Sequence, residues 1–213
     1  MGSVSNLKLG QHVNEAEAAR ADLYGLLAAL FYSPPSEILL AVLAAAQMDG
    51  ENALDAAWNA FVQCAASTSA AAVHEEFLEL FVDRDQQKLE LRATYYLEPF
   101  LRIDEQLALR ADLQLLDLPE GLLIAEVEDH IASLCEVMRY LISAEANLSL
   151  RQATQKKFFL AHMQTWVPQL CAAIRAHPRA RLYASLAVLA NVFFETEMQA
   201  FKLSKVVRQD AEP

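Results

Sequence analysis

The chain has 213 residues, and its 17 Lys and Arg against 28 Asp and Glu give a formal net charge of −11. Apolar residues make up 54% of it, while 5 Gly and 7 Pro are too few for the many turns of a sheet protein. This composition excludes a largely disordered chain and indicates an all-α protein. The negative charge repels phosphate backbones, so we expect no nucleic acid among its partners and favour a cationic peptide.

The cysteines and the first apolar run indicate a cytoplasmic protein without stable membrane anchoring. Three widely spaced cysteines without a CxxC motif predict reduced core residues rather than disulfides or a zinc site: Cys64, Cys135 and Cys171. The run from Leu23 to Tyr32 is about half the length that spans a bilayer. Acidic Glu15 and Glu17 precede this run, which is unlike a secretory signal.

Apolar residues that recur every three or four positions predict helices along most of the chain. In chain order we expect them over about 12–32, 36–48, 53–67, 70–82, 101–116, 126–145, 152–166, 168–177 and from Pro178 to about Leu203. The stretch 95–100 is predicted to be irregular or a short broken helix, because Pro99 disfavours helix at Glu98. Pro119-Glu120-Gly121 is the best hinge candidate. We therefore expect one helical lobe over 1–118, a hinge over 119–125 and a second lobe over 126–213.

The sequence carries no motif typical of an enzyme site. It has no nucleophile elbow, no Gly-rich phosphate loop and no HExxH. A di-iron bundle needs a Glu three residues before a His, and Val127 stands at that position before His130. We expect no catalytic residue, no metal ligand and no cofactor.

A cluster of charged residues precedes His130, and it comprises Glu126, Glu128 and Asp129. On a helix begun at 126, His130 lies on the flank of the apolar stripe and Asp129 points nearly opposite that stripe. One interpretation is an acidic first turn that complements the helix dipole, with one half-buried histidine. The other is a ligand-facing helix terminus, with Asp129 accepting from a Lys or Arg and His130 as a donor or lining residue.

An aromatic stretch follows the charged segment 83–88. It comprises Tyr95, Tyr96, Leu97, Glu98, Pro99 and Phe100. If this stretch only fills part of the hydrophobic core, it needs no further function. As a site it offers apolar area with hydroxyl tips, the combination that peptide-binding grooves favour.

Glu197 falls inside the apolar face of the last predicted helix, with Glu195 turned away from it. A buried glutamate must be paired or neutral. Either Glu197 is solvated near the frayed helix end, or it contributes to an acidic pocket.

Five segments between residues 20 and 202 form a recognisable pattern: EFLELFV at 76–82, YYL at 95–97, EVEDHI at 126–131, FL-x-H-x-x-x-W-x-P at 159–168 and FFE-x-E at 193–197. In their order and spacing they resemble the TorD/DmsD/NarJ family of redox-enzyme maturation chaperones. YYL and residues 134–138 resemble most the branch that accompanies formate dehydrogenases. Val127 replaces the proline of the family's Glu-Pro-x-Asp-His loop, and the Gly-Pro-Gly segment of many members is absent.

The resemblance implies an all-α, TorD-like bundle of about 9–11 helices in two lobes and a cytoplasmic, non-catalytic role. Members bind the twin-arginine signal peptide, and often the apo form, of a molybdenum enzyme until its cofactor is inserted. We therefore predict a signal-peptide site in an acidic, aromatic-edged groove formed by Glu126, Glu128, Asp129, His130, Tyr95, Tyr96, Glu98, Pro99, Phe100 and Glu197.

Two other classes of protein remain as alternatives: a metal or small-molecule enzyme on a helical bundle, and a plain helical protein-interaction scaffold. The hinge is compatible with a monomer or with a domain-swapped dimer. On the chaperone hypothesis, replacing Asp129 and His130 by alanine is expected to weaken leader binding without unfolding the protein.

Overall fold

The structure is a computed structural model of the chain, and it describes residues 3–82, 88–116, 118–122, 128–144 and 148–209. Side chains are described over 15–82, 88–116, 118–122, 128–144 and 150–203. Within these ranges the regular structure consists of ten α-helices, one π-helix and a single isolated β-bridge. The prediction of an all-α protein is confirmed.

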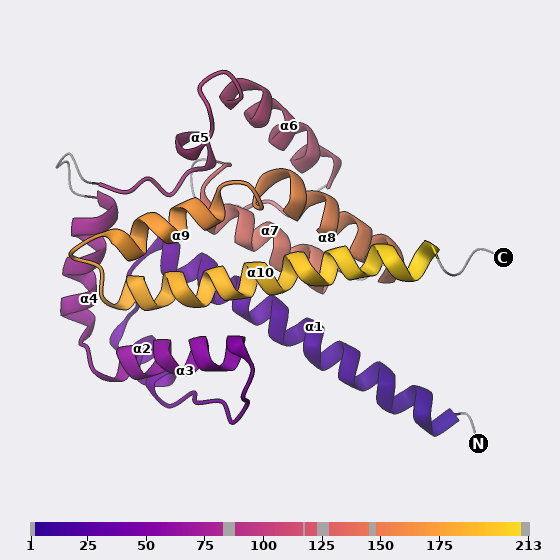
Figure 1. Ribbon diagram of the computed structural model, residues 1–213, viewed down its shortest axis with the longest axis horizontal. Coiled ribbons are helices and arrows are strands. Elements are labelled where there is room, and N and C mark those ends of the chain that lie inside the picture. The colour runs from indigo at the N-terminus through magenta and orange to yellow at the C-terminus, as the bar shows by residue number, and fades with distance from the viewer. Residues whose placement is uncertain (1–2, 83–87, 117, 123–127, 145–147, 210–213) are drawn as a thin grey trace.

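The elements are α1 (Ser3–Tyr32), α2 (Glu37–Ala44), α3 (Ala53–Ala66), α4 (Ala70–Phe77), the π-helix η1 (Leu78–Val82), α5 (Ala93–Tyr96), α6 (Arg102–Leu115), α7 (Ile131–Ser143), α8 (Leu148–His162), α9 (Val167–Ala176) and α10 (Leu182–Gln209). In Figure 1, α10 crosses the middle of the molecule with α9 beside it, and α5 and α6 lie at one edge. α10 packs against α3 and α9, while α7 packs against α1 and α8.

Local sequence sets the start of several helices. The side chains of Ser36, Asn52 and Ser69 accept hydrogen bonds from backbone N–H groups in the first turns of α2, α3 and α4, at 3.0–3.2 Å. Such caps satisfy donors that a helix leaves without an internal partner. Pro168 stands in the first turn of α9, where its missing N–H costs nothing.

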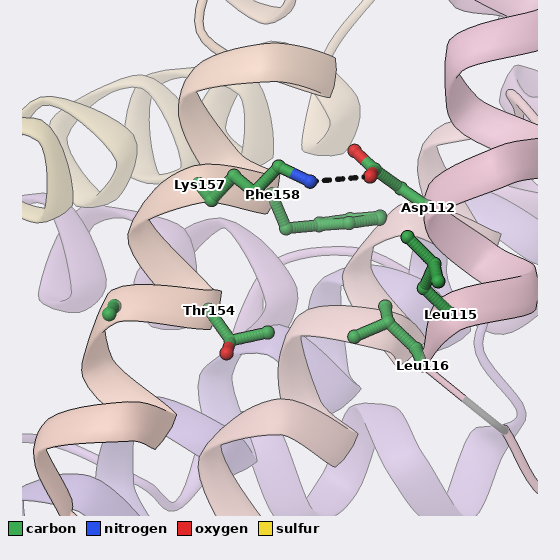
Figure 2. Close-up of a pocket in the computed structure, with 7 residues that line it drawn as sticks. Asp112, Leu115, Leu116, Thr154, Lys157 and Phe158 are labelled. Carbon is green, nitrogen blue, oxygen red and sulfur yellow. Dashed lines mark hydrogen bonds and ion pairs between the residues drawn. The ribbon is translucent and has the colours of Figure 1, made fainter.

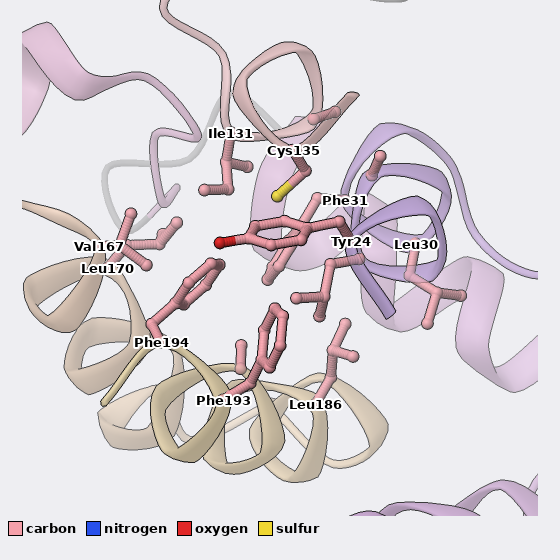
Figure 3. Packing of buried hydrophobic residues seen from close by; sticks show 14 of the residues in the cluster. Tyr24, Leu30, Phe31, Ile131, Cys135, Val167, Leu170, Leu186, Phe193 and Phe194 are labelled. Atoms are coloured by element: carbon pink, nitrogen blue, oxygen red, sulfur yellow. The ribbon is translucent and has the colours of Figure 1, made fainter. Parts of the chain in front are cut away.

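One hydrophobic core extends across the molecule and holds the long helices together. Figure 3 shows Tyr24 of α1 enclosed by Cys135 of α7 and by Phe193 and Phe194 of α10. The rings of Tyr24 and Phe193 meet edge to face with centroids 4.8 Å apart. α7 is buried over nearly all its length, so it forms the centre of the bundle rather than one of its faces.

Several helix boundaries differ from the sequence-based expectation. α1 begins at Ser3 rather than near His12, and α10 begins at Leu182, four residues after Pro178. α7 begins at Ile131 instead of 126, because the backbone of His130 is extended and its side chain caps the helix. Glu128 and Asp129 are therefore not in a helical first turn.

The stretch 95–100 contains only the end of the short helix α5 and a turn, as predicted. The division into two lobes around 119–125 stays a prediction. In the described part of that segment, Gly121 has φ of +79°, a conformation that favours glycine.

Candidate functional site

The two predicted site segments are joined by their backbones. Arg92 and His130 form the β-bridge. The N–H of Ala93 donates to the carbonyl of Asp129 at 3.0 Å, and the N–H of Ile131 donates to the carbonyl of Leu91 at 2.9 Å. The start of α5 is therefore fixed to the start of the central helix α7, although 37 residues separate Arg92 from Asp129.

The carboxylate of Asp129 is buried, with 3% of the residue exposed, and it is fully engaged by its own chain. One oxygen accepts from Arg92 Nε at 3.2 Å, and the other accepts from the N–H and the hydroxyl of Thr94 at 3.0 and 2.8 Å. The helical projection that pointed Asp129 outward was wrong, because the helix begins later. Asp129 therefore holds residues 92–94 in place and leaves little of its carboxylate for a ligand.

His130 caps α7 and is half-buried. Its Nδ1 accepts a hydrogen bond from the N–H of Ala132 at 3.1 Å. Burial lowers the pKa of His130 below its ordinary value of 6.5, and the charge of Asp129 offsets only part of that effect. The imidazole is therefore neutral at pH 7, and because Nδ1 accepts, Nε2 carries the proton and can act as a donor.

Glu128 lies beside this frame and turns towards α6. Its carboxylate accepts from Arg110 Nε at 2.7 Å. It also borders a hollow of about 450 Å³, lined in addition by Arg110, Leu113, Gln114, Leu118, Pro119, Gly121 and Leu122. Glu126 lies outside the described residues.

The aromatic pair of α5 has one anchored and one exposed member. The ring of Tyr96 stacks on buried Trp166, with centroids 5.7 Å apart at 24°, and its hydroxyl donates to the carbonyl of Glu90 at 2.9 Å. Burial, with smaller effects of Tyr95 and Glu90, raises the pKa of Tyr96, so this hydroxyl stays protonated. Tyr95 is 58% exposed.

The residues after α5 face solvent. Glu98, Pro99 and Phe100 are exposed, and Phe100 is 76% exposed. Together with Tyr95 they form a surface that combines two aromatic rings with a carboxylate, and we call these four residues the 95–100 surface. Tyr96 packs against Tyr95 of this surface, and its own ring and hydroxyl are held by Trp166 and Glu90.

Glu197 belongs to a different network, on α10. Its carboxylate accepts two hydrogen bonds from Arg20 of α1, both at 2.7 Å, and one from the hydroxyl of Tyr24 at 3.1 Å. Only 3% of Glu197 is exposed, so the expectation of a solvated helix end was wrong. None of these partners lies in the segments 92–100 or 128–130.

Sequence reasoning missed the residues that hold the site together. Arg92 and Thr94 bind Asp129, and Trp166 supports Tyr96. No periodic signal marks Arg92 or Thr94, because their partner is distant in the chain. Trp166 belonged to the resemblance pattern, but nothing in its spacing shows which ring it contacts.

The arrangement offers hydrogen bonding and apolar contact rather than bond chemistry. Across the described residues, no group of three or more His, Cys, Asp or Glu is placed to hold a metal ion. In the same ranges no helix is long and apolar enough to cross a bilayer.

Comparison with known proteins defines the class. Residues 48–172 match the family described as nitrate reductase delta subunit. The chain belongs to this family, whose members are NarJ/TorD-type chaperones that act in the maturation of molybdoenzymes and are not themselves catalytic. The matched region includes α5, α6, α7 and the whole 95–100 surface. No curated protein matches the chain.

Proposed function

We propose that this chaperone acts in the cytoplasm and binds the twin-arginine leader, and with it the apo form, of a molybdenum-containing oxidoreductase of the formate dehydrogenase type. The 95–100 surface is the observation that carries this proposal. It presents exposed aromatic rings and a carboxylate on a backbone that Asp129 fixes to the central helix. A twin-arginine leader offers the complementary features, adjacent positive charges followed by an apolar run.

Apolar contact is expected to provide most of the affinity. Each leader Leu or Phe side chain that becomes buried contributes about 1.5–3 kcal/mol before ordering costs. An exposed contact between an arginine and Glu98 adds about 0–1 kcal/mol and weakens with salt. The carboxylates therefore orient the leader and accelerate its association more than they tighten the complex.

The structure changes which variant tests this proposal. Replacing Asp129 removes three internal hydrogen bonds, so Asp129→Ala would disturb the fold as well as the surface. Tyr95→Ala is the better variant because the Tyr95 side chain is exposed and its ring meets the ring of Tyr96 edge to face.

We expect Tyr95→Ala to weaken binding of a synthetic formate dehydrogenase leader from the same organism by about 1–2 kcal/mol, as for a contact tyrosine at a binding surface. Isothermal titration calorimetry measures this change. The matched control is Tyr32→Ala, which removes a tyrosine of similar exposure, 52%, from the end of α1. Equal affinities of the wild type and both variants would contradict the placement of the site.

The client itself can be identified independently. The tagged full chain, expressed in its native host, is expected to retain the catalytic subunit of a formate dehydrogenase, which mass spectrometry of the bound material detects. If a different molybdoenzyme is retained, the proposed client is wrong and the proposed chaperone role stands. Retention of the mature subunit after deletion of its leader, at an unchanged level, would favour a plain interaction scaffold.

A further inference from the structure

Helix α6 exposes an apolar stripe that continues the 95–100 surface. Ile103, Leu107 and Leu115 are 68%, 59% and 78% exposed, and Phe100, which is 76% exposed, precedes them in the chain. With Ala111 between Leu107 and Leu115, these residues follow at steps of four and form one ridge that runs obliquely along the exposed side of α6. Leu109, on the opposite face, is 2% exposed and attaches α6 to the bundle.

The residues of the stripe suit contact with a second helix. Ala108 and Ala111 are exposed among the large side chains, and their small size lets a second helix approach α6 closely. Ridges of residues four apart pack into the grooves of a partner helix when two helices meet. Contiguous exposed apolar surface of this kind marks interaction sites in proteins that are otherwise well packed.

A hollow between α6 and α8 lies at the far end of the stripe. It has a volume of about 340 Å³ and is lined by Asp112, Leu115, Leu116, Ala153, Thr154, Lys157 and Phe158. Figure 2 shows Leu115 of α6 and the following Leu116 facing Thr154 and Phe158 of α8, with the ion pair of Lys157 and Asp112 beside them. Such a hollow can receive one bulky apolar side chain, the usual anchor of a bound helix.

The two ends of the stripe differ in charge. Glu98, Arg102 and Asp104 are exposed at its beginning, where the two carboxylates outnumber the one guanidinium. The far end is the apolar hollow. With a net charge of −11, a second copy of this chain would be repelled, whereas a peptide with a basic beginning and an apolar end is complementary.

We propose that the apolar run of the twin-arginine leader binds as a helix along the α6 stripe, parallel to α6. Its arginines lie by Glu98 and Asp104, and a large apolar side chain near its end enters the hollow at Leu115. An apolar run of about 7–15 residues is typical of leaders. As a helix it covers about 10–22 Å, and Ile103 to Leu115 spans about 18 Å. This inference rests on the proposed function.

The stripe is tested by two variants of equal exposure. Leu107→Asp places a charge in the middle of the stripe, and Val42→Asp places one on α2, where Val42 is 60% exposed. We expect Leu107→Asp to weaken binding of the synthetic leader at least tenfold in calorimetry, and Val42→Asp to change it less than twofold. Leu107→Ala, which introduces no charge, is expected to weaken binding three- to fivefold. It tests the stripe even if Leu107→Asp misfolds.

The orientation is tested by paramagnetic broadening. A nitroxide at the N-terminus of the bound leader is expected to broaden amide signals near Glu98 and Asp104. A nitroxide at the C-terminus is expected to broaden those near Leu115 and Phe158. Carbon chemical shifts of the labelled leader report whether it is helical when bound.

The outcomes separate this inference from the proposed function. If the leader binds the wild type but Leu107→Asp and Val42→Asp behave alike, the docking site is wrong and the chaperone proposal stands. The reversed broadening pattern, or an extended bound leader, overturns the parallel helix. A leader that does not bind the wild type overturns both.

Discussion

Glu76 is a buried carboxylate of α4 that holds the start of the last long helix. Its two oxygens accept hydrogen bonds from the N–H groups of Arg181, Leu182 and Tyr183, at 2.7, 3.1 and 2.8 Å. These donors belong to the beginning of α10, where a helix has unsatisfied N–H groups and a partial positive charge. A residue more than 100 positions away thus acts as the cap of α10.

Replacing Glu76 by alanine is expected to lower the free energy of unfolding by about 2–4 kcal/mol, because it leaves buried N–H donors without partners. Urea denaturation measures the change. Glu76→Gln keeps one acceptor oxygen, so its free energy of unfolding is expected to lie between those of Glu76→Ala and the wild type. The control is Glu75→Ala, an exposed neighbour on the same helix. A loss for Glu75→Ala as large as that for Glu76→Ala would refute the capping role.

At the scale of elements, one buried histidine contributes to the attachment of α6. His162 of α8 is 2% exposed, and its two ring nitrogens lie 2.8 Å from a carboxylate oxygen of Glu105 and 2.9 Å from one of Asp112. Because both neighbours are carboxylates, both nitrogens must donate, which requires the protonated imidazole. Lys157 reinforces the pair at 2.6 Å from Asp112.

The protonation of His162 makes the attachment of α6 depend on pH. Burial opposes protonation, but hydrogen bonds and charges of Glu105 and Asp112 outweigh it and raise the pKa of His162 above 6.5. A raised pKa in the folded state stabilises the protein fully below the unfolded value of about 6.5, and this contribution disappears as pH rises through the folded value.

We therefore expect the protection of α6 amides from hydrogen exchange, corrected for the intrinsic rate, to fall as pH rises above about 6.5. His162→Gln is expected to show weaker protection and no such pH dependence between pH 6 and 9. His177→Gln is the control, since His177 lies at the end of α9. An equal pH dependence in wild type and His162→Gln would show that another group is responsible.

At the scale of the whole molecule, the first and last helices are joined by the pair of Arg20 and Glu197. Arg20 Nε and a terminal nitrogen each donate to one oxygen of Glu197, and Arg20 also contacts Glu17. Burial, with the charge of Glu197, raises the pKa of Tyr24, so its hydroxyl stays protonated and donates to the same carboxylate. This network explains how a glutamate can occupy the apolar face of α10.

Removing one partner of this pair is expected to cost more than removing both. Arg20→Met leaves Glu197 buried without its cation and should reduce the free energy of unfolding by about 2–3 kcal/mol, at the lower end for buried pairs because Arg20 is partly exposed. Arg20→Met with Glu197→Gln should recover about 1 kcal/mol or more. Urea denaturation of the four proteins of the cycle gives these values. Additive losses in the double variant would show that the pair is not coupled.

Much of the fold and part of the site could be predicted from local patterns. The apolar spacing located most of the helices, and the order of five segments indicated the family that residues 48–172 match. The sequence signals for where a helix begins were less reliable. Acidic residues suggested a helix that begins at 126. Asp129 instead accepts a hydrogen bond from Thr94, and the helix begins at Ile131.

The sequence alone determined the all-α class and the family, because these depend on composition and spacing, and it required a partner for Glu197 only if that residue is buried. Only the tertiary structure decided that Arg20 is that partner, that Asp129 faces inward and that α6 turns its apolar stripe outward. The α6 sequence is apolar on two faces, Leu109 on one and Leu107 on the other. Hydrogen bonds between His162 and two α6 carboxylates, formed across some 50 residues of chain, hold the Leu109 face against the bundle.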